Sequence, residues 1–500
     1  MLNEECQRNW GEVMQHAINK VARNSIFIFL ARITDLIIVT ILVSLAAHYL
    51  GLKVFGEYAF VRAIAFVLSP VIAFGSIRIL IREMSVEKEN TSLFLSSGLA
   101  LNGLMTIVVG IITTIIAFNF HLGSTSIIAL YLAVLAQVLM VMQNTACSVF
   151  VAYEKMVYDL LTTFVTHLST LLFFLIVIFF DFGIIGLLIA SVVGNGAGLF
   201  LTFLILAHKF ALPKVDINFR HQIYLLKEAF PIGISTFLSQ GYTYFNVFLL
   251  KLFRDISQVS FFQAPQRVIA PILLIPNSFL FAFVPTLSRL ASDETLNSNL
   301  QYAYNKTLKY ILILSLPVSI ILTMYASKVV LLFFGREFLE ATASFQILIW
   351  TIVPLFANSL LSFILTSIKK QKVLPISTLA CFITNCLLGF LLVEKYGHVG
   401  ASIASLISSG VLFMINFYYV SKYLGFIPVH RIAPRLLFAG VTMYLFLLGL
   451  VGIFNMVTVS ISAFLIYFGI LYLSRTFTSD EIEIFKSAIP MNLKKGQKQK

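Results

Sequence analysis

Apolar segments long enough to cross a lipid bilayer recur along this chain, and no other feature restricts its fold as strongly. A transmembrane helix needs about 20 predominantly apolar residues. Hydrophobic residues make up 59% of the chain and charged residues 11%. Soluble domains are nearer ~45–50% apolar, so a soluble globular protein is excluded. The sequence predicts an all-α polytopic membrane protein with about fourteen transmembrane helices, at 25–48, 58–81, 93–118, 126–151, 157–180, 183–207, 229–252, 259–288, 307–334, 341–367, 373–393, 398–421, 432–453 and 456–474.

The basic residues are distributed unevenly between the two predicted sides of the membrane. If the first 24 residues lie in the cytoplasm, 26 of the 35 lysines and arginines fall in cytoplasmic segments. Cytoplasmic loops carry such an excess, so we expect a multi-pass protein of the cell membrane with both termini in the cytoplasm. The net charge of +13 then describes an inner face against anionic lipid, and nucleic-acid binding is not needed to explain it.

A weak internal duplication divides the chain into two halves. An offset of 205 residues pairs Arg62 with Arg267. It also pairs three further identical residues, Ala59 with Ala264, Ile64 with Ile269 and Ala65 with Ala270. Each half holds six predicted spans, so both copies have the same orientation and an axis along the membrane normal relates them.

The duplication predicts two pseudo-symmetric six-helix lobes around a central cleft, followed by a C-terminal helix pair outside the repeat. The expected domains are a cytoplasmic arm at 1–24, an N-lobe at 25–208, a basic cytoplasmic linker at 209–228, a C-lobe at 229–424, an accessory helix pair at 425–475 and a basic cytoplasmic tail at 476–500.

The stretch 260–292, around the eighth predicted span, has features that a lipid-facing helix does not need. It carries Arg267 and four prolines, Pro265, Pro271, Pro276 and Pro285. A charge at membrane depth costs ~2.5–3.5 kcal/mol on insertion scales, so it is expected to face a wet cavity or a partner. Prolines free backbone carbonyls, which is tolerable only where neighbouring helices or water satisfy them. We therefore expect this span to line a functional cavity.

Four segments carry a family likeness: LGLKVFGEYAF with GSIRILIREMS around the second span, FFQAPQRVIAP leading to FVPTLSRLASD in the eighth, LFFGREFLEATASFQILIW before the tenth, and GHVGASIASLISS opening the twelfth. Together with the number and order of the spans, these segments extend the likeness over roughly residues 25–475. They resemble the polysaccharide transporters, or O-antigen-type flippases, of the multidrug/oligosaccharidyl-lipid/polysaccharide (MOP) exporter superfamily.

The resemblance implies a flippase for cell-surface polysaccharide biosynthesis. Such a protein moves a polyprenyl-(di)phosphate-linked oligosaccharide from the cytoplasmic to the outer leaflet by alternating access between the two lobes. It is not an enzyme, and glycan-assembly enzymes are candidate partners. The related lipid II flippases carry arginines in cavity-lining helices one, two and eight, and Arg32, Arg62 and Arg267 lie in those helices here.

These three arginines are candidate ligands for the phosphate groups, because arginine binds phosphate oxygens bidentately and remains charged in the membrane. Arg62 has an alternative role, since it could snorkel to the outer headgroups. Arg32 has Asp35 three residues later on the same helical face, so the two could simply neutralise each other. Asp35 is also the candidate proton or sodium site that would couple transport to an ion gradient.

Polar residues of the seventh span are candidate contacts for sugar hydroxyls, chiefly Gln240 and Tyr242, with Tyr244 and Asn246 beside them. Asparagine and glutamine also join helices by hydrogen bonds, and Asn246 fits that role better. His167, in the middle of the fifth span, is either a titrating group or a packing residue. The four cysteines have no metal-ligand spacing, and no metal or other cofactor is expected.

Two other classes of function remain open at this point. A cation-coupled multidrug or small-molecule exporter of the same superfamily would need acidic residues in its cleft, where this chain offers three arginines and one aspartate. A membrane-embedded polysaccharide polymerase or ligase would need a large outer loop, which no predicted connection provides. The sequence has no GxxxxGK[ST] loop, so energy from nucleotide hydrolysis at a P-loop is excluded.

Overall fold

The structure, a computed structural model, describes residues 2–120, 123–210, 212, 219–273, 297–425, 429–450 and 455–477. Within these ranges the side chains of residues 2–33, 35–36, 219–221, 224, 303 and 429–431 are outside the description. Every regular element in the described ranges is a helix. The α-helices are α1 (Leu2–Ala73), α2 (Ser76–Val86), α3 (Thr91–Asn119), α4 (Ser124–Ala152), α5 (Met156–Phe180), α6 (Gly183–Lys209), α7 (Phe219–Phe253), α8 (Ile256–Ile272), α10 (Asn297–Met324), α11 (Ala326–Phe334), α12 (Ala341–Leu348), α13 (Ile352–Ser367), α14 (Val373–Leu424), α15 (Val429–Leu450) and α16 (Met456–Leu473), with short 3₁₀ turns η1 (Lys88–Asn90), η3 (Arg336–Phe338) and η4 (Ile349–Thr351).

Ten helical segments in these residues are long and apolar enough to cross a membrane. Two of them, Ile37–Val86 and Val373–Leu424, have 50 and 52 residues, and each is long enough for two crossings of about 20 residues. They bend at Gly51 (φ 68°) and Gly397 (φ 55°), where only glycine avoids steric cost at positive φ. The predicted all-α polytopic fold is confirmed, and the predicted count of fourteen spans is approximate.

The second predicted span, 58–81, is interrupted rather than continuous. Phe74 and Gly75 have φ values of 47° and 73° and separate α1 from α2. A Cβ atom on Gly75 would lie 2.7 Å from the carbonyl oxygen of Ala229 and 2.7 Å from the amide of Gly233. The break therefore allows the backbone of α7 to approach this point closely. The second half of the eighth predicted span, 274–288, lies outside the described residues.

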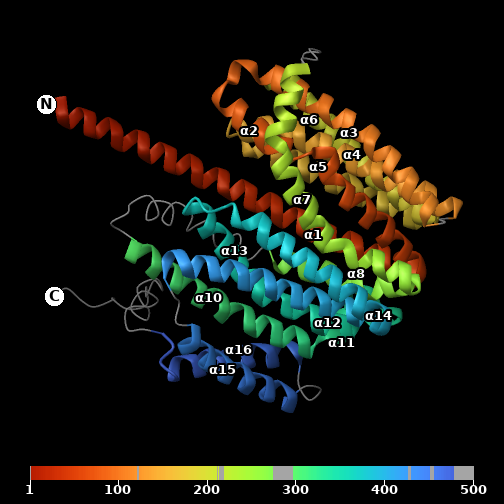
Figure 1. The fold of residues 1–500 in the computed structure, drawn as a ribbon, viewed down its shortest axis with the longest axis vertical. Helices are drawn as coiled ribbons and strands as arrows, with labels where there is room; N and C mark the ends of the chain where they lie inside the picture. The colour runs from red at the N-terminus through yellow and green to blue at the C-terminus, as the bar shows by residue number, and fades with distance from the viewer. Residues whose placement is uncertain are drawn as a thin grey trace, which may run out of the picture.

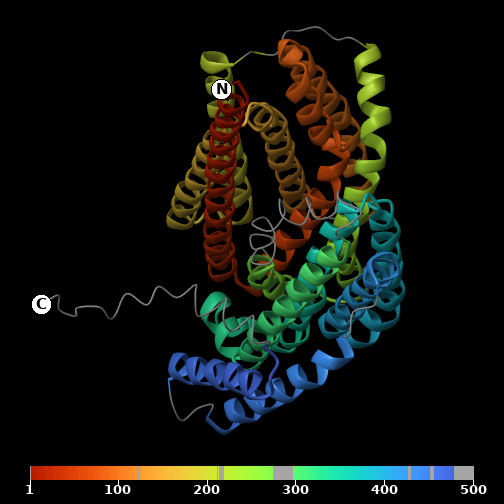
Figure 2. The same cartoon turned by 90° about the vertical axis from the view of Figure 1, so that its left-hand side faces the viewer.

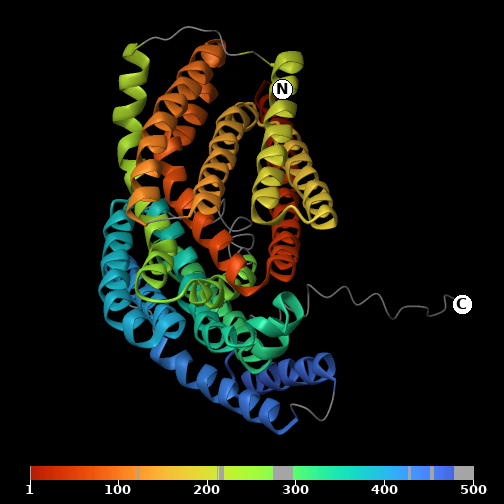
Figure 3. The same cartoon turned by 90° about the vertical axis from the view of Figure 1, so that its right-hand side faces the viewer.

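The helices form two bundles that meet at one end (Figures 1 and 2). α1 to α6 make the first bundle, and α8 with α10 to α14 make the second. α7 runs along both, with its beginning beside α2 and α3 and its end beside α14 (Figure 3). The pair α15 and α16 packs on the outside of the second bundle against α10. One cluster of buried apolar side chains extends from α1 through α8 into α10 to α14, so the two bundles share a core where they meet.

The shared end of the bundles is closed by contacts around the bend of α1. The Ser260 hydroxyl donates a hydrogen bond to the carbonyl oxygen of Leu52 at 2.6 Å. The amide of Leu52 donates to Glu337 Oε2 at 3.1 Å, and the rings of Phe55 and Phe338 pack edge to face with centroids 5.5 Å apart. The first of these contacts fixes α8 against α1, and the other two fix η3 against α1.

Two residues 205 positions apart make equivalent contacts in the two bundles. The Tyr49 hydroxyl donates to Asp181 Oδ1 at 2.8 Å and accepts from the amide of Gly183 at 2.8 Å, which ties α1 to the turn between α5 and α6. The Arg254 guanidinium donates to the carbonyl oxygen of Lys395 at 2.9 Å, which ties α7 to the bend of α14. The equivalence is consistent with the predicted duplication.

Tyr49→Phe is expected to destabilise the first bundle by about 0.5–1.5 kcal/mol, because the hydrogen bonds to Asp181 and from the Gly183 amide are lost. The measurement is the midpoint of thermal unfolding of the purified protein in detergent. Tyr472→Phe is the matched control, since the Tyr472 side chain is 60% exposed on α16. Equal midpoints for the two variants would contradict a stabilising role for the Tyr49 contact.

Candidate functional site

Two neighbouring cavities lie beside the contact between α1 and α8. The first, the N-cavity, has a volume of about 280 Å³ and is lined by α1, α4, α5, α6 and one residue of α8. Its polar lining residues are Arg62, Gln137, His167, Thr170, Ser191, Asn195 and Arg267. The second, the C-cavity, has a volume of about 170 Å³ and is lined by α7, α8, η4 and the helices α12 to α14. Its polar lining residues are Tyr242, Thr243, Tyr244, Gln263, Gln266, Arg267, Thr351 and Ser405.

Arg62 lies on α1 and is fixed by two aromatic rings from its own helix. Its Nη1 donates a hydrogen bond to the Tyr58 hydroxyl at 2.7 Å. Its Cζ lies 5.1 Å from the centroid of the Tyr58 ring and 5.4 Å from that of Phe66. A guanidinium within about 6 Å of a ring centroid is stabilised by the cation–π interaction. The Arg62 side chain is therefore half-buried and packed against Tyr58 and Phe66.

Arg267 lies on α8 and reaches the same aromatic ring from the other side of the interface. Its Cζ is 5.6 Å from the centroid of Phe66. Tyr244 of α7 stacks on Phe66 with centroids 5.6 Å apart and an interplanar angle of 2°. Within the described residues Arg267 lines both cavities. The two arginines that the offset of 205 residues pairs are thus brought together around one ring.

The beginning of α8 is fixed, and this contributes to the position of Arg267. Asp255 caps the helix by accepting a hydrogen bond from the amide of Ser257 at 3.1 Å. The hydrogen bonds from Ser257 hold the pKa of the Asp255 carboxyl below its usual range. An Asp cap of this kind stabilises a helix by about 1 kcal/mol.

The lining of the two cavities is positively charged. Arginine is the only residue type among the described lining residues with a permanent charge, and no aspartate or glutamate is present among them. No group of three potential metal ligands occurs in the described part of the chain. Opposite charge stabilises a buried guanidinium, so the site is suited to an anionic ligand with oxygen acceptors.

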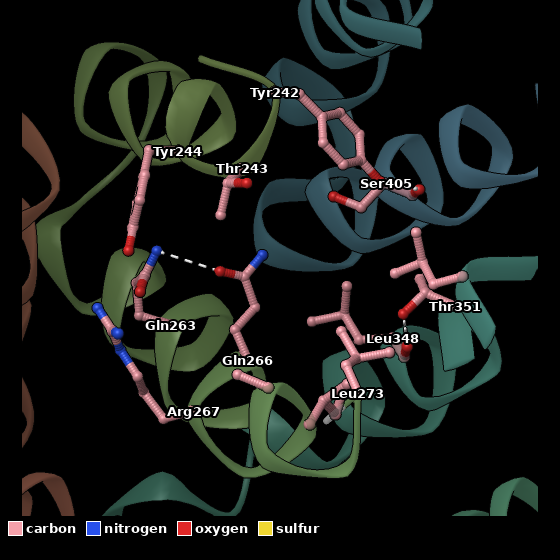
Figure 4. Close-up of a pocket in the computed structure, with 13 residues that line it drawn as sticks. Tyr242, Thr243, Tyr244, Gln263, Gln266, Arg267, Leu273, Leu348, Thr351 and Ser405 are labelled. Atoms are coloured by element: carbon pink, nitrogen blue, oxygen red, sulfur yellow. Dashed lines mark hydrogen bonds between the residues drawn. The ribbon is translucent and has the colours of Figure 1, made fainter. Parts of the chain in front are cut away.

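The C-cavity is otherwise lined by uncharged polar groups. Gln263 is 1% exposed, and its Nε2 donates to Gln266 Oε1 at 3.3 Å. The Tyr242 hydroxyl donates to the carbonyl oxygen of Ser405 at 3.3 Å. Figure 4 shows Gln266 extending toward Thr243, with Arg267 on one side of the chamber and Thr351 and Ser405 on the other.

The structure brings together some of the residues expected from the sequence and not others. Arg62, Arg267 and Tyr242 line the cavities. Gln240 is half-buried and lines neither cavity. The backbones of Arg32 and Asp35 belong to α1, but their side chains lie outside the described residues.

His167 and Asn246, which were also considered as candidates from the sequence, differ in their surroundings. His167 lines the N-cavity. Asn246 is 1% exposed and joins helices: its Nδ2 donates to Asn385 Oδ1 at 2.9 Å and to Ser405 Oγ at 3.1 Å, both on α14.

The glutamine side chains of α8 that line the C-cavity were not predicted, although the spacing of residues in this helix indicates one of them. Gln263, Arg267 and Ala270 are four and three residues apart, and such positions lie on one face of a helix. The face that carries Arg267 therefore also carries Gln263. Gln137 of α4 and Asn195 of α6 had no comparable signal, because nothing in the sequence marks the face that their helices turn to the N-cavity.

The family described as "polysaccharide biosynthesis protein" matches residues 21–291, more than half of the chain. A Shigella flexneri protein named "Putative O-antigen transporter" is 29% identical over 174 residues, which is 34% of this chain and 40% of the relative. An uncharacterized membrane protein of Methanocaldococcus jannaschii is 25% identical over 165 residues, 32% of each chain. The matched regions therefore cover less than half of these two relatives.

Solved structures show a similar fold. The lipid II flippase MurJ in an inward closed conformation has a TM-score of 0.71 and 18% identity, over 91% of this chain and 100% of that one. An inward-facing multidrug resistance transporter of the MATE family, in the MOP superfamily, has a TM-score of 0.61 and 17% identity, over 79% of this chain and 94% of that one. The chain thus has the fold of the MOP superfamily.

Proposed function

Since the chain belongs to the polysaccharide biosynthesis protein family, we propose that it is a flippase for a polyprenyl-(di)phosphate-linked oligosaccharide. It moves this lipid from the cytoplasmic to the outer leaflet by alternating access and is not itself an enzyme. One observation carries the proposal: Arg62 and Arg267 converge on Phe66 beside cavities whose described lining has no carboxylate.

The arginine pair supplies what transport of a phosphate group through a membrane needs. An isolated anion would have to leave water to cross ~30 Å of hydrocarbon, and desolvation of an unpaired charge is very costly. Two guanidinium groups offer paired donors to the phosphate oxygens at a fixed place. Because Phe66 contacts both of them, one diphosphate could bind across the interface of the two bundles. Arg32, on the same helix as Arg62, is proposed as a third contact along the path.

We propose that the closed end at Gly51 faces outward, with both termini in the cytoplasm of a cell that carries the protein in its cytoplasmic membrane. The uneven distribution of lysine and arginine supports this orientation. The first bundle then corresponds to an N-lobe at 25–208, and the second bundle together with most of α7 corresponds to a C-lobe at 229–424. Asp35 on α1 is the proposed site for a coupling proton or sodium ion.

The MATE-like fold also suits a cation-coupled drug exporter. A cationic drug would need acidic partners in the cleft, and the described lining offers arginine instead. This charge makes the drug exporter the weaker candidate.

The test is transport in proteoliposomes that contain a fluorescent polyprenyl diphosphate oligosaccharide. A membrane-impermeant reductant measures the fraction of fluorophore on the accessible leaflet, with and without an imposed proton or sodium gradient. We expect the reconstituted protein to move the lipid between leaflets and protein-free vesicles to leave it in place. Efflux of a cationic dye without movement of the glycolipid would overturn the proposal.

A further inference from the structure

We propose that the C-cavity is a subsite for the sugar residue attached directly to the diphosphate, an uncharged ring recognised by Gln263, Gln266 and Thr351. The inference rests on the proposed function, because it takes Arg267 as the phosphate contact. It goes further in assigning the glycan to the α8 side of the interface.

The position of the two glutamines relative to Arg267 supports this assignment. Gln263 belongs to the same helix as Arg267, and residues four apart on a helix have Cβ atoms only ~5–6 Å apart. Gln266 directly precedes Arg267, and its Oε1 accepts a hydrogen bond from Gln263 Nε2. The first sugar of a sugar diphosphate is bonded to the phosphate itself. A phosphate on Arg267 therefore brings this ring next to the amide groups that line the C-cavity.

The polar groups of the C-cavity match the hydroxyls of a sugar. A primary amide presents both a donor and an acceptor and so can bridge neighbouring hydroxyls. Gln266 uses its Oε1 to accept from Gln263, and its Nε2 has no hydrogen-bond partner within the described part of the chain. The Thr351 hydroxyl donates to the carbonyl oxygen of Leu348 at 2.6 Å, which leaves its oxygen able to accept from a ligand. The chamber thus offers a donor and an acceptor on opposite sides.

Size and charge restrict the ligand further. The volume of about 170 Å³ is below the ~300–1,000 Å³ of pockets for drug-sized molecules, so the chamber suits about one ring. Apart from Arg267, the described lining carries no charged side chain. Leu273 and Leu348 form an apolar part of the lining (Figure 4), where the less polar face of a sugar or an acetamido methyl group can pack.

The experiment compares binding of matched probes to the full-length protein in nanodiscs. The probes are one polyprenyl diphosphate without sugar and the same lipid carrying glucose, galactose or N-acetylglucosamine. We expect wild type to bind at least one sugar-bearing probe about tenfold more tightly than the sugarless lipid. Gln266→Leu and Thr351→Val should each reduce this difference to about threefold or less and leave affinity for the sugarless lipid unchanged.

Gln346→Leu is the matched control, because Gln346 is an exposed residue of α12 outside both cavities. It should retain the full sugar-dependent difference. Binding of the sugarless lipid also shows that each variant is folded. If wild type binds the sugarless lipid but no sugar adds affinity, or if both variants keep the difference, the sugar subsite is wrong and the phosphate site stands. If wild type does not bind the sugarless lipid, the proposed function and the subsite fall together.

Discussion

Arg267→Ala is expected to lower the rate of oligosaccharide flipping in proteoliposomes by roughly 100-fold, and Arg62→Ala by roughly tenfold. A hydrogen bond to a charged group contributes about 1.5–3 kcal/mol, and two such bonds lost from a bidentate contact correspond, at the lower end of this range, to about a 100-fold change. Arg267 lines both cavities, and it makes no hydrogen bond with another residue in the described part of the chain. Arg62 already donates through Nη1 to Tyr58, so it has fewer donors for a ligand and its loss should cost less.

The charge and the shape of the arginine can be separated with a second substitution. Arg267→Lys keeps the positive charge but not the planar fork, so an intermediate rate is expected. Arg78→Ala is the control, because Arg78 is an exposed residue of α2 that lines neither cavity. A double variant, Arg62→Ala with Arg267→Ala, that flips the lipid at the wild-type rate would exclude the arginine pair from transport.

Much of this site can be predicted from the sequence, because a charged residue inside an apolar span is costly and therefore indicates a cavity or a partner. Arg62 and Arg267 stand out in their spans, and their equivalent positions in the duplication suggest that they serve one purpose. The fold is predictable because backbone N–H and C=O groups in lipid must find their hydrogen-bond partners within a helix. The apolar segments of the sequence therefore define most of the helices. The breaks at Gly51 and Gly397 also fall between predicted spans.

The sequence did not predict which polar residues line the cavities, because this depends on the rotation of each helix about its axis and on the position of each residue along it. Gln240 and Tyr244 are four residues apart and share a helix face, yet one turn separates them by about 6 Å. Tyr244 lines the C-cavity and Gln240 does not. Likewise, Phe66 is an ordinary apolar residue of its span. Its contact with Arg62 lies within α1, but its contact with Arg267 arises only when α1 and α8 pack together.

Gly56→Val is expected to prevent the end of the molecule near Gly51 from closing as it does here, and to reduce transport by at least about tenfold. A Cβ atom on Gly56 would lie 2.4 Å from the carbonyl oxygen of Ile256 and 2.8 Å from the Ser260 hydroxyl. A backbone carbonyl cannot move aside as a side chain can, so α1 and α8 must separate. Alternating access requires one end to close before the other opens, and a flippase that cannot close this end cannot complete its cycle.

The opening is measurable as a distance between spin labels at Lys53 of α1 and at Glu340, the residue before α12, which are exposed residues of the first and the second bundle. Gly103→Val is the matched control, since a Cβ atom on Gly103 of α3 has no neighbour within 4 Å. In the Gly56 variant the distance should lengthen and flipping should fall. An unchanged distance in that variant would mean that α1 and α8 adjust locally to the larger side chain. A normal flipping rate with a lengthened distance would mean that closure of this end is not part of the transport cycle.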